Sequence, residues 1–150
     1  MSIKGFTIIE LLIVLTIVAV LVGVTSLPVI RFRREQALQN TTNAVLTVIN
    51  EARAKTLAGT NNTNYSVRFE SDRAILFQGA AYQSTSGTNQ IFLYESPVVL
   101  GTVALSGGGS EITFDRLRGT TAQHGTLQLQ LPGFSSTTIT VTTTGTVARN

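Results

Sequence analysis

The chain has 150 residues, which suits one domain of ordinary size with a terminal appendage and excludes two full domains. Cysteine is absent, so disulfides, thiolate metal sites and a cysteine nucleophile are excluded. Charged residues make up 13% of the chain and the formal net charge is +3, too thinly spread to indicate by itself binding to nucleic acid or to a membrane surface.

The segment from Phe6 to Leu27 is apolar, and Glu10 is its one charged residue. At a rise of about 1.5 Å per residue, a helix of this length measures about 33 Å, enough for a hydrocarbon core of about 30 Å. An ionised side chain in such a helix costs about 2.5–3.5 kcal/mol at the centre and less near the end. The position of Glu10 therefore needs a physical explanation.

Three interpretations of this segment compete. A cleaved secretory signal is disfavoured, because the apolar run is long, a charge interrupts it, and the small residues from Gly23 to Ser26 form a poor cleavage signal. A permanent anchor fits the length but leaves Glu10 unexplained. The third interpretation is a cut between Gly5 and Phe6 that removes a short leader and keeps the apolar run.

Such a cut would give Glu10 a partner. The new amine of Phe6 would be positively charged and would lie roughly one helical turn from the carboxylate, at about 5.4 Å per turn. A carboxylate in the first turn also faces the positive end of the helix dipole. If these helices pack side by side and staggered, Glu10 of one subunit can meet the amine of the next, so the acid sets the register of the bundle.

The stretch KGFTIIELLIV, residues 4–14, resembles the class III signal of type IV pilins and of type II secretion pseudopilins. The resemblance implies cleavage after Gly5 by a prepilin peptidase, N-methylation of Phe6 and a subunit-docking role for Glu10. It implies as partners other pilin or pseudopilin subunits, the peptidase, an inner-membrane assembly platform and the lipid bilayer.

The charges that flank the apolar run favour the opposite orientation in the membrane. Arg31, Arg33 and Arg34 follow it, against Lys4 alone before it, so the positive-inside rule would place the rest of the chain in the cytoplasm. The motif is more specific than a charge count. We therefore expect a single pass through the inner membrane, a cytoplasmic Lys4, and a head outside the cytoplasm that enters an extracytoplasmic filament.

Beyond the apolar run, the sequence predicts a second, amphipathic half of the same helix. Pro28 predicts a kink or break, because proline removes a backbone donor and clashes with the preceding turn. Gly59 predicts the helix end, near Ala58. Residues at spacings of three and four predict one apolar face: Ala37, Leu38, Thr41, Ala44, Val45, Val48, Ile49 and Ala52.

The rest of the chain predicts a β-rich head. Short runs rich in β-branched and aromatic residues are separated by glycine, proline and Ser/Thr clusters, and two of them alternate with period two. The predicted strands are residues 65–69, 74–77, 91–94, 98–105, 111–114, 126–131 and 137–143. We predict an α+β, pilin-like fold with antiparallel strands on the amphipathic half-helix, divided into a leader 1–5, an apolar half-helix 6–30, an amphipathic half-helix 31–59 and a head 60–150.

The carboxyl-terminal region, EITFDRLRGTTAQHGTLQLQ followed by STTITVTTTGTVARN, resembles the GspH/FimT group of minor pseudopilins and minor pilins. This resemblance implies a minor, structural subunit of a type IV pilus or of a type II secretion pseudopilus. Some FimT-like minor pilins bind DNA through a terminal Gly-Arg-x-Arg element. Here the matching stretch, Gly145 to Arg149, has threonine at one arginine position, so Arg149 is the single candidate for DNA contact in this alternative.

The remaining candidates have ordinary structural explanations. His124 is the single histidine, so it has no second histidine or cysteine with which to hold a metal, and we predict a solvent-facing loop residue. The run 107–109 lacks the lysine of a phosphate-binding loop and predicts a hairpin loop. Asp115, Arg116 and Arg118 predict a surface ion pair or turn. No nucleophile, base and orienter can be assembled, so we expect no enzyme, no cofactor and no metal site.

Overall fold

The computed structural model describes residues 5–150, and for residues 24–28 it describes the backbone alone. Lys4 and most of the predicted leader therefore lie outside the described residues. The chain forms two compact units, Met1–Arg34 and Glu35–Asn150, and each is described by itself.

One helix, α1, runs from Ile8 to Leu57 and contributes to both units. It continues through Pro28, so of the predicted kink or break the break does not occur, and the kink stays a prediction. A proline removes a single backbone donor, and the hydrogen bonds of neighbouring residues can carry a helix past it. The end of the helix lies where the sequence predicted it. Gly59 follows the helix in the left-handed conformation, at φ 64°, and precedes the short 3-10 helix η1, Thr60–Asn62.

In the amino-terminal unit, the described part of α1 leaves its large apolar side chains exposed. Their exposed fractions run from 49% to 82% between Phe6 and Val22 and at Val29, Ile30 and Phe32. Across the part of the chain that the structure describes, no helix combines the length and the apolar character needed to cross a membrane.

In the second unit, α1 buries one stripe. The predicted apolar face is buried apart from Ala44, which is exposed, while Thr42 and Thr56 are buried in addition. Each threonine hydroxyl donates a hydrogen bond to the helix backbone. Thr42 Oγ1 donates to the Leu38 carbonyl at 2.7 Å, and Thr56 Oγ1 donates to the Ala52 carbonyl at 2.8 Å. This bonding lets a polar residue occupy a buried position without an unsatisfied donor.

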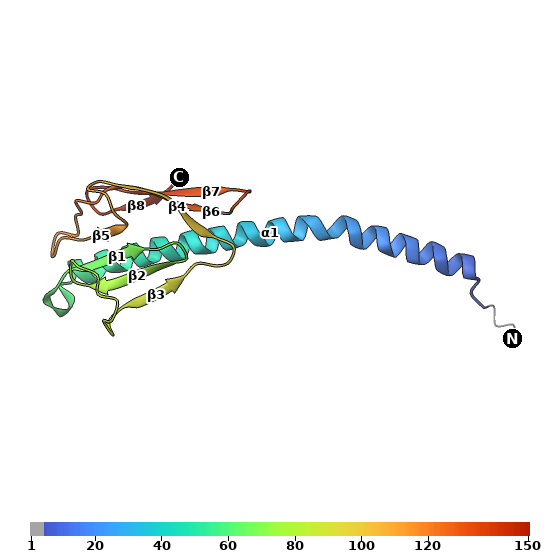
Figure 1. The fold of residues 1–150 in the computed structure, drawn as a ribbon, viewed down its shortest axis with the longest axis horizontal. Helices are drawn as coiled ribbons and strands as arrows, with labels where there is room; N and C mark the ends of the chain where they lie inside the picture. Colours follow the sequence, from blue (N-terminus) through green and yellow to red (C-terminus); the bar gives the residue numbers. More distant parts are fainter. Residues whose placement is uncertain (1–4) are drawn as a thin grey trace. The chain divides into compact units, whose positions relative to one another are not determined.

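The strands form two antiparallel four-stranded sheets, with the orders β3-β2-β1-β5 and β4-β6-β7-β8. Figure 1 shows them against the carboxyl-terminal part of α1. The first sheet contains β1 Tyr65–Phe69, β2 Arg73–Gln78, β3 Gln90–Leu93 and β5 Glu111–Thr113. The second contains β4 Val99–Leu105, β6 Gly125–Gln130, β7 Ser136–Val141 and β8 Val147–Arg149. The α+β, pilin-like prediction is confirmed.

The core of the second unit is shared by the helix and both sheets. Val48 and Ile49 of α1, Val67 of β1 and Leu127 of β6 belong to one buried cluster. In β6 and β7 the buried residues alternate with half-buried Gln and Thr, as the period-two pattern predicts. Each sheet therefore covers the amphipathic helix with one apolar face.

Two connections differ from the sequence prediction. Residues 107–109 follow β4 and precede β5, which lie in different sheets, so this glycine run links the two sheets and the predicted hairpin was wrong. Its three glycines have φ of 85°, 73° and 86°, and residues other than glycine rarely adopt this left-handed conformation. The strand β8 was not among the predicted strands; it pairs with β7.

The end of α1 meets the carboxyl-terminal region at Gly119. The Arg53 side chain donates from Nε to the Gly119 carbonyl at 3.1 Å. A Cβ added to Gly145 would lie 2.0 Å from that same carbonyl oxygen and 3.1 Å from the Phe114 ring, and Gly145 has φ 76°. Glycine is therefore required at position 145 both by its conformation and by the close approach of the backbone.

Candidate functional site

The predicted cleavage site lies ahead of α1. Gly5 and Phe6 precede the first helical residue, and the Phe6 side chain is 81% exposed. A Cβ added to Gly5 would meet no atom within 4 Å. The peptide bond between these two residues is thus in an open, non-helical segment, as a peptidase needs.

Thr7 fixes the start of α1. Its Oγ1 accepts a hydrogen bond from the Glu10 backbone N–H at 3.3 Å, and its carbonyl accepts one from the Leu11 N–H at 3.2 Å. Threonine is a favoured N-cap residue, and glutamate three positions later is the spacing of a capping box. The sequence reasoning missed this cap, although the pattern Thr-x-x-Glu carried the signal.

Glu10 lies in the first turn of α1 and its side chain is exposed. The carboxylate lies close to the unpaired backbone N–H groups of the helix start, where the dipole favours a negative charge by about 0.3–1 kcal/mol at an exposed position. It stands beside exposed apolar side chains, such as those of Ile9 and Leu11. A charge in such surroundings can therefore be reached by a partner that packs on this face.

Residues 1–26 match the family model described as the prokaryotic N-terminal methylation motif. This motif is the signal of type IV pilins and pseudopilins, so the chain carries the signal of a type IV pilin-like precursor. Prepilin peptidase processes such precursors, which are anchored in the membrane and then assemble with other pilins into an extracellular filament. No curated protein and no solved structure is similar enough to the chain to count as a match.

Arg149, the candidate for DNA contact, is exposed at the end of β8. The strands β4, β6, β7 and β8 contain no other charged side chain, so Arg149 has no basic neighbour within its own sheet. Affinity for a polyanion grows with the number of phosphates that are neutralised. The sheet that carries Arg149 therefore offers DNA one cation.

Arg31, Arg33 and Arg34 lie on α1 in the amino-terminal unit. Arg31 and Arg33 are exposed and Arg34 is half-buried. Their role at a membrane boundary remains a prediction.

The other sequence candidates occupy loops. His124 is exposed, and its Nδ1 lies 3.1 Å from the Ala122 carbonyl oxygen. Asp115 organises a turn: its carboxylate accepts from Thr120 Oγ1 at 2.7 Å and its carbonyl accepts from the Gly119 N–H at 2.8 Å. Over residues 5–150, no ion pair joins Asp115 to Arg116 or Arg118, and no group of three potential ligands could hold a metal ion.

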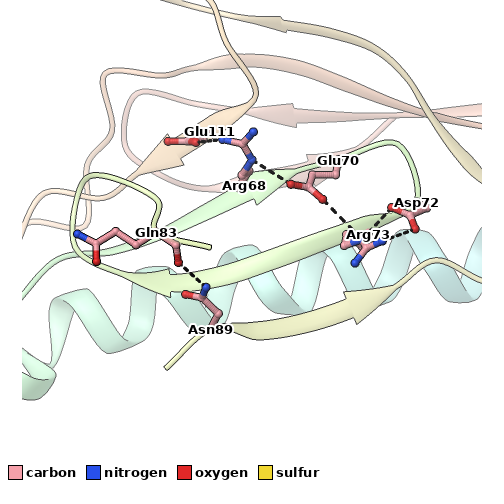
Figure 2. A network of polar contacts seen from close by, with 7 residues as sticks. All are labelled: Arg68, Glu70, Asp72, Arg73, Gln83, Asn89 and Glu111. Atoms are coloured by element: carbon pink, nitrogen blue, oxygen red, sulfur yellow. Dashed lines mark hydrogen bonds and ion pairs between the residues drawn. The ribbon is translucent and has the colours of Figure 1, made fainter. Parts of the chain in front are cut away.

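A charged network that the sequence analysis missed lies on the first sheet (Figure 2). Arg68 of β1 donates from Nη1 to Glu111 of β5 at 2.6 Å and from Nε to Glu70 at 3.2 Å. Arg73 pairs with Asp72 at 2.8 Å. The hydrogen bond to Glu111 raises the pKa of Arg68, and the hydrogen bond from Arg73 lowers the pKa of the Asp72 carboxyl. Because the charges bind one another, this network is suited to joining strands rather than to chemistry.

Proposed function

We propose that the chain is a minor pilin-like structural subunit, of the GspH/FimT type, of a type IV pilus or of a type II secretion pseudopilus. The observation that carries the proposal is the methylation motif at residues 1–26, which includes the start of a helix whose apolar side chains are exposed. A long run of exposed apolar side chains favours burial against lipid or against other helices. Packed helices of other subunits would supply such a surface.

In this proposal the apolar half-helix, residues 6–30, serves two environments. Before assembly it holds the subunit in the inner membrane as a single pass, with the head outside the cytoplasm. When the assembly platform extracts the subunit, contacts with neighbouring helices replace the contacts with lipid, and the gain comes from packing rather than from a further hydrophobic effect. The remaining chain then supplies the surface of the filament.

Glu10 gives the helices their register. Its carboxylate would pair with the methylated amine of Phe6 on the neighbouring subunit, because an acid left among packed apolar side chains is costly unless a cation compensates it. The exposure of Glu10 and its place in the first turn of α1 support this role. Arg31, Arg33 and Arg34 lie about six to seven turns from Glu10 along the same helix, at about 3.6 residues per turn, so they cannot replace that amine.

Intact-mass measurement of the protein extracted from membranes tests the processing step. We expect the mass of a chain that begins at Phe6 with one added methyl group. Gly5→Leu should retain the full leader, and since position 5 has open space around it, this substitution should not disturb the fold. A wild-type chain that keeps Met1 to Gly5 would contradict the proposal.

Substitution of Glu10 tests the docking step. Glu10→Gln keeps the size of the side chain and removes its charge, so membrane insertion should be unchanged while incorporation into filaments falls by about tenfold or more, the effect of losing one buried charge pair. Glu35→Gln is the matched control, because it makes the same change at an exposed position on the same helix. Equal incorporation of Glu10→Gln and the control would rule out the docking role.

We also propose that the subunit has no catalytic activity of its own, since we find no nucleophile, base and orienter together in the part of the chain that the structure describes. The alternative function is DNA binding by a FimT-like minor pilin, supported by the exposed Arg149. It predicts retardation of DNA by the detergent-solubilised chain at low salt, with loss of retardation in Arg149→Gln. Absence of retardation in the wild-type chain would remove this alternative.

A further inference from the structure

The turn between β6 and β7 exposes an aromatic side chain to which the filament role assigns no task. Phe134 is 54% exposed and follows Pro132 and Gly133, which are exposed as well. The Phe134 N–H donates to the Leu131 carbonyl at 3.0 Å, and the Leu131 N–H donates to the Ser135 carbonyl at 2.7 Å, so hydrogen bonds close the turn. A single exposed apolar residue is common on protein surfaces, so its place in the fold decides what it means.

A hydrogen bond joins this turn to the beginning of the helix in the second unit. Ser135 Oγ donates to Glu35 Oε1 at 3.1 Å, and Glu35 is the first residue of that unit. The other end of the same helix stretch is marked by Leu117, whose N–H donates to the Thr56 carbonyl at 3.3 Å. From residue 35 to residue 56 the helix rises about 32 Å, at about 1.5 Å per residue. The β6–β7 turn and Leu117 therefore belong to opposite ends of the second unit.

The β6–β7 turn lies close along the chain to the predicted exit from the membrane. In the proposed function, on which this inference rests, residues 6–30 hold the subunit in the inner membrane. A chain reaches at most about 3.6 Å per residue, so Glu35 lies no farther than about 18 Å from residue 30. As a helix, which residues 31–35 form, this segment measures about 8 Å. The headgroup layer on each side of a bilayer is about 5–8 Å thick, so Glu35 is expected at its outer edge.

The charges near this point favour a surface that carries phosphate groups. Arg31 and Arg33 precede Glu35 in the chain and are exposed, and arginine side chains bind lipid phosphates. The turn itself, residues 131–135, contains no charged residue, so it strips water from no ion of its own when it enters the headgroup layer. The Glu35 carboxylate, which a described hydrogen bond joins to the turn, already accepts from Ser135. The exposed cations that follow the apolar half-helix therefore match lipid phosphates.

We propose that, before assembly, the β6–β7 turn rests in the headgroup layer of the membrane, with the Phe134 ring at the boundary of the hydrocarbon core. Aromatic and other apolar side chains are favoured at this depth, where the backbone of the turn can still meet water. Because hydrogen bonds already close the turn and join it to α1, insertion would not need to order it. The head would then have a second attachment to the membrane, which is broken when the subunit is extracted.

The experiment uses tryptophan fluorescence of the full chain, which contains no tryptophan of its own. Phe134→Trp is reconstituted in vesicles of phosphatidylcholine and phosphatidylglycerol, and its emission is measured with and without lipids brominated on the acyl chain, which quench tryptophan on contact. Leu117→Trp is the matched control, because Leu117 is an apolar residue of the same unit with a similar exposed fraction, 65%. We expect quenching of Phe134→Trp to exceed that of Leu117→Trp by about twofold or more.

A third variant separates this inference from the proposed function. Val18 lies in the apolar half-helix and is 50% exposed, so Val18→Trp should be quenched by the same lipids if that segment enters the membrane. Absence of quenching in Val18→Trp would overturn the membrane anchoring, and this inference with it. If Val18→Trp is quenched and Phe134→Trp is quenched no more than Leu117→Trp, the anchoring stands and the inference alone is overturned, which is also the result expected if Phe134 contacts a protein partner instead of lipid.

Discussion

The helix α1 contains two stretches with opposite surroundings. In the described part of residues 8–34 the large apolar side chains are exposed, whereas residues 35–57 bury one stripe in a core shared with two sheets. Both stretches are helical, so secondary structure does not distinguish them. What distinguishes them is burial: strands of the same chain cover the second stretch, whereas the described apolar side chains of the first stretch are exposed.

Because of this difference, substitutions in the two stretches of the helix are expected to have different effects. A substitution in the second stretch is paid for in the stability of the head, because the buried side chains contact strands of the same molecule. In the proposed filament, a substitution in the first stretch would leave the isolated subunit unchanged and would act when helices of several subunits pack together. The predictions that follow use matched substitutions to test this separation.

The largest effect is expected when the same residue type is truncated in each stretch. Ile49 is 0% exposed, so Ile49→Ala should lower the free energy of unfolding by about 2–5 kcal/mol, through lost burial and the cavity left behind. Ile13 is 56% exposed, and Ile13→Ala should change it by no more than about 0.5 kcal/mol. Thermal unfolding of the full chain in detergent, followed by near-UV circular dichroism, measures both. Equal losses would show that the head depends on the first stretch.

A somewhat smaller effect is expected at Gly145. Gly145→Ala would place a Cβ 2.0 Å from the Gly119 carbonyl oxygen, so the backbone must shift, and we expect a loss of about 2–4 kcal/mol. Gly133 has a similar φ, 77°, but open space around it, so Gly133→Ala should cost only about 1–2 kcal/mol for the left-handed conformation. Chemical denaturation of both variants gives the comparison. If they lose the same stability, the contact with Gly119 is not what requires glycine.

The smallest effect concerns Tyr94, whose hydroxyl is buried with no hydrogen-bond partner among the described residues. Burial, with the nearby charges of Asp72 and Glu70, raises the pKa of Tyr94. The folded state thus favours the protonated phenol, and its contribution to stability is fully present below the unfolded pKa of about 10 and is lost as pH rises above it. Unfolding temperatures between pH 8 and pH 11 should fall for the wild-type chain.

Tyr94→Phe should make that fall less steep and should leave stability at pH 8 equal or slightly higher, because it removes an unpaired buried hydroxyl. Tyr82→Phe provides the control. An identical pH dependence in wild type and Tyr94→Phe would mean that this tyrosine does not titrate on unfolding in that range.

Much of the fold could be read from local patterns. The period-two runs placed β6 and β7 to within two residues of their bounds, and the glycine at position 59 placed the end of α1. Local sequence patterns could not predict features that depend on contacts between residues far apart in the chain. Ala44 fits the apolar spacing yet lies exposed, because neither sheet reaches its side of the helix, and β8 is a strand because β7 offers it an edge.

The candidate sites divide in the same way. Gly5, Phe6 and Glu10 lie in a contiguous motif, so the sequence alone was sufficient to propose them, and Thr7 could have been found from its spacing to Glu10. The charged network on the first sheet could not have been found, since Arg68 and Glu111 come from strands that only the pairing of β1 with β5 brings together. No spacing in the sequence marks them as neighbours.

The junction at Gly119 has a consequence for the order in which the chain is completed during synthesis. The end of α1 reaches its final surroundings only when Gly145 is available to lie against Gly119, and β8, which pairs with β7, follows Gly145 in the chain. At about 5–20 residues per second, the roughly 120 residues between the end of residues 6–30 and residues 145–149 take about 6–24 seconds to translate. The apolar stretch is therefore synthesised several seconds before the head can close.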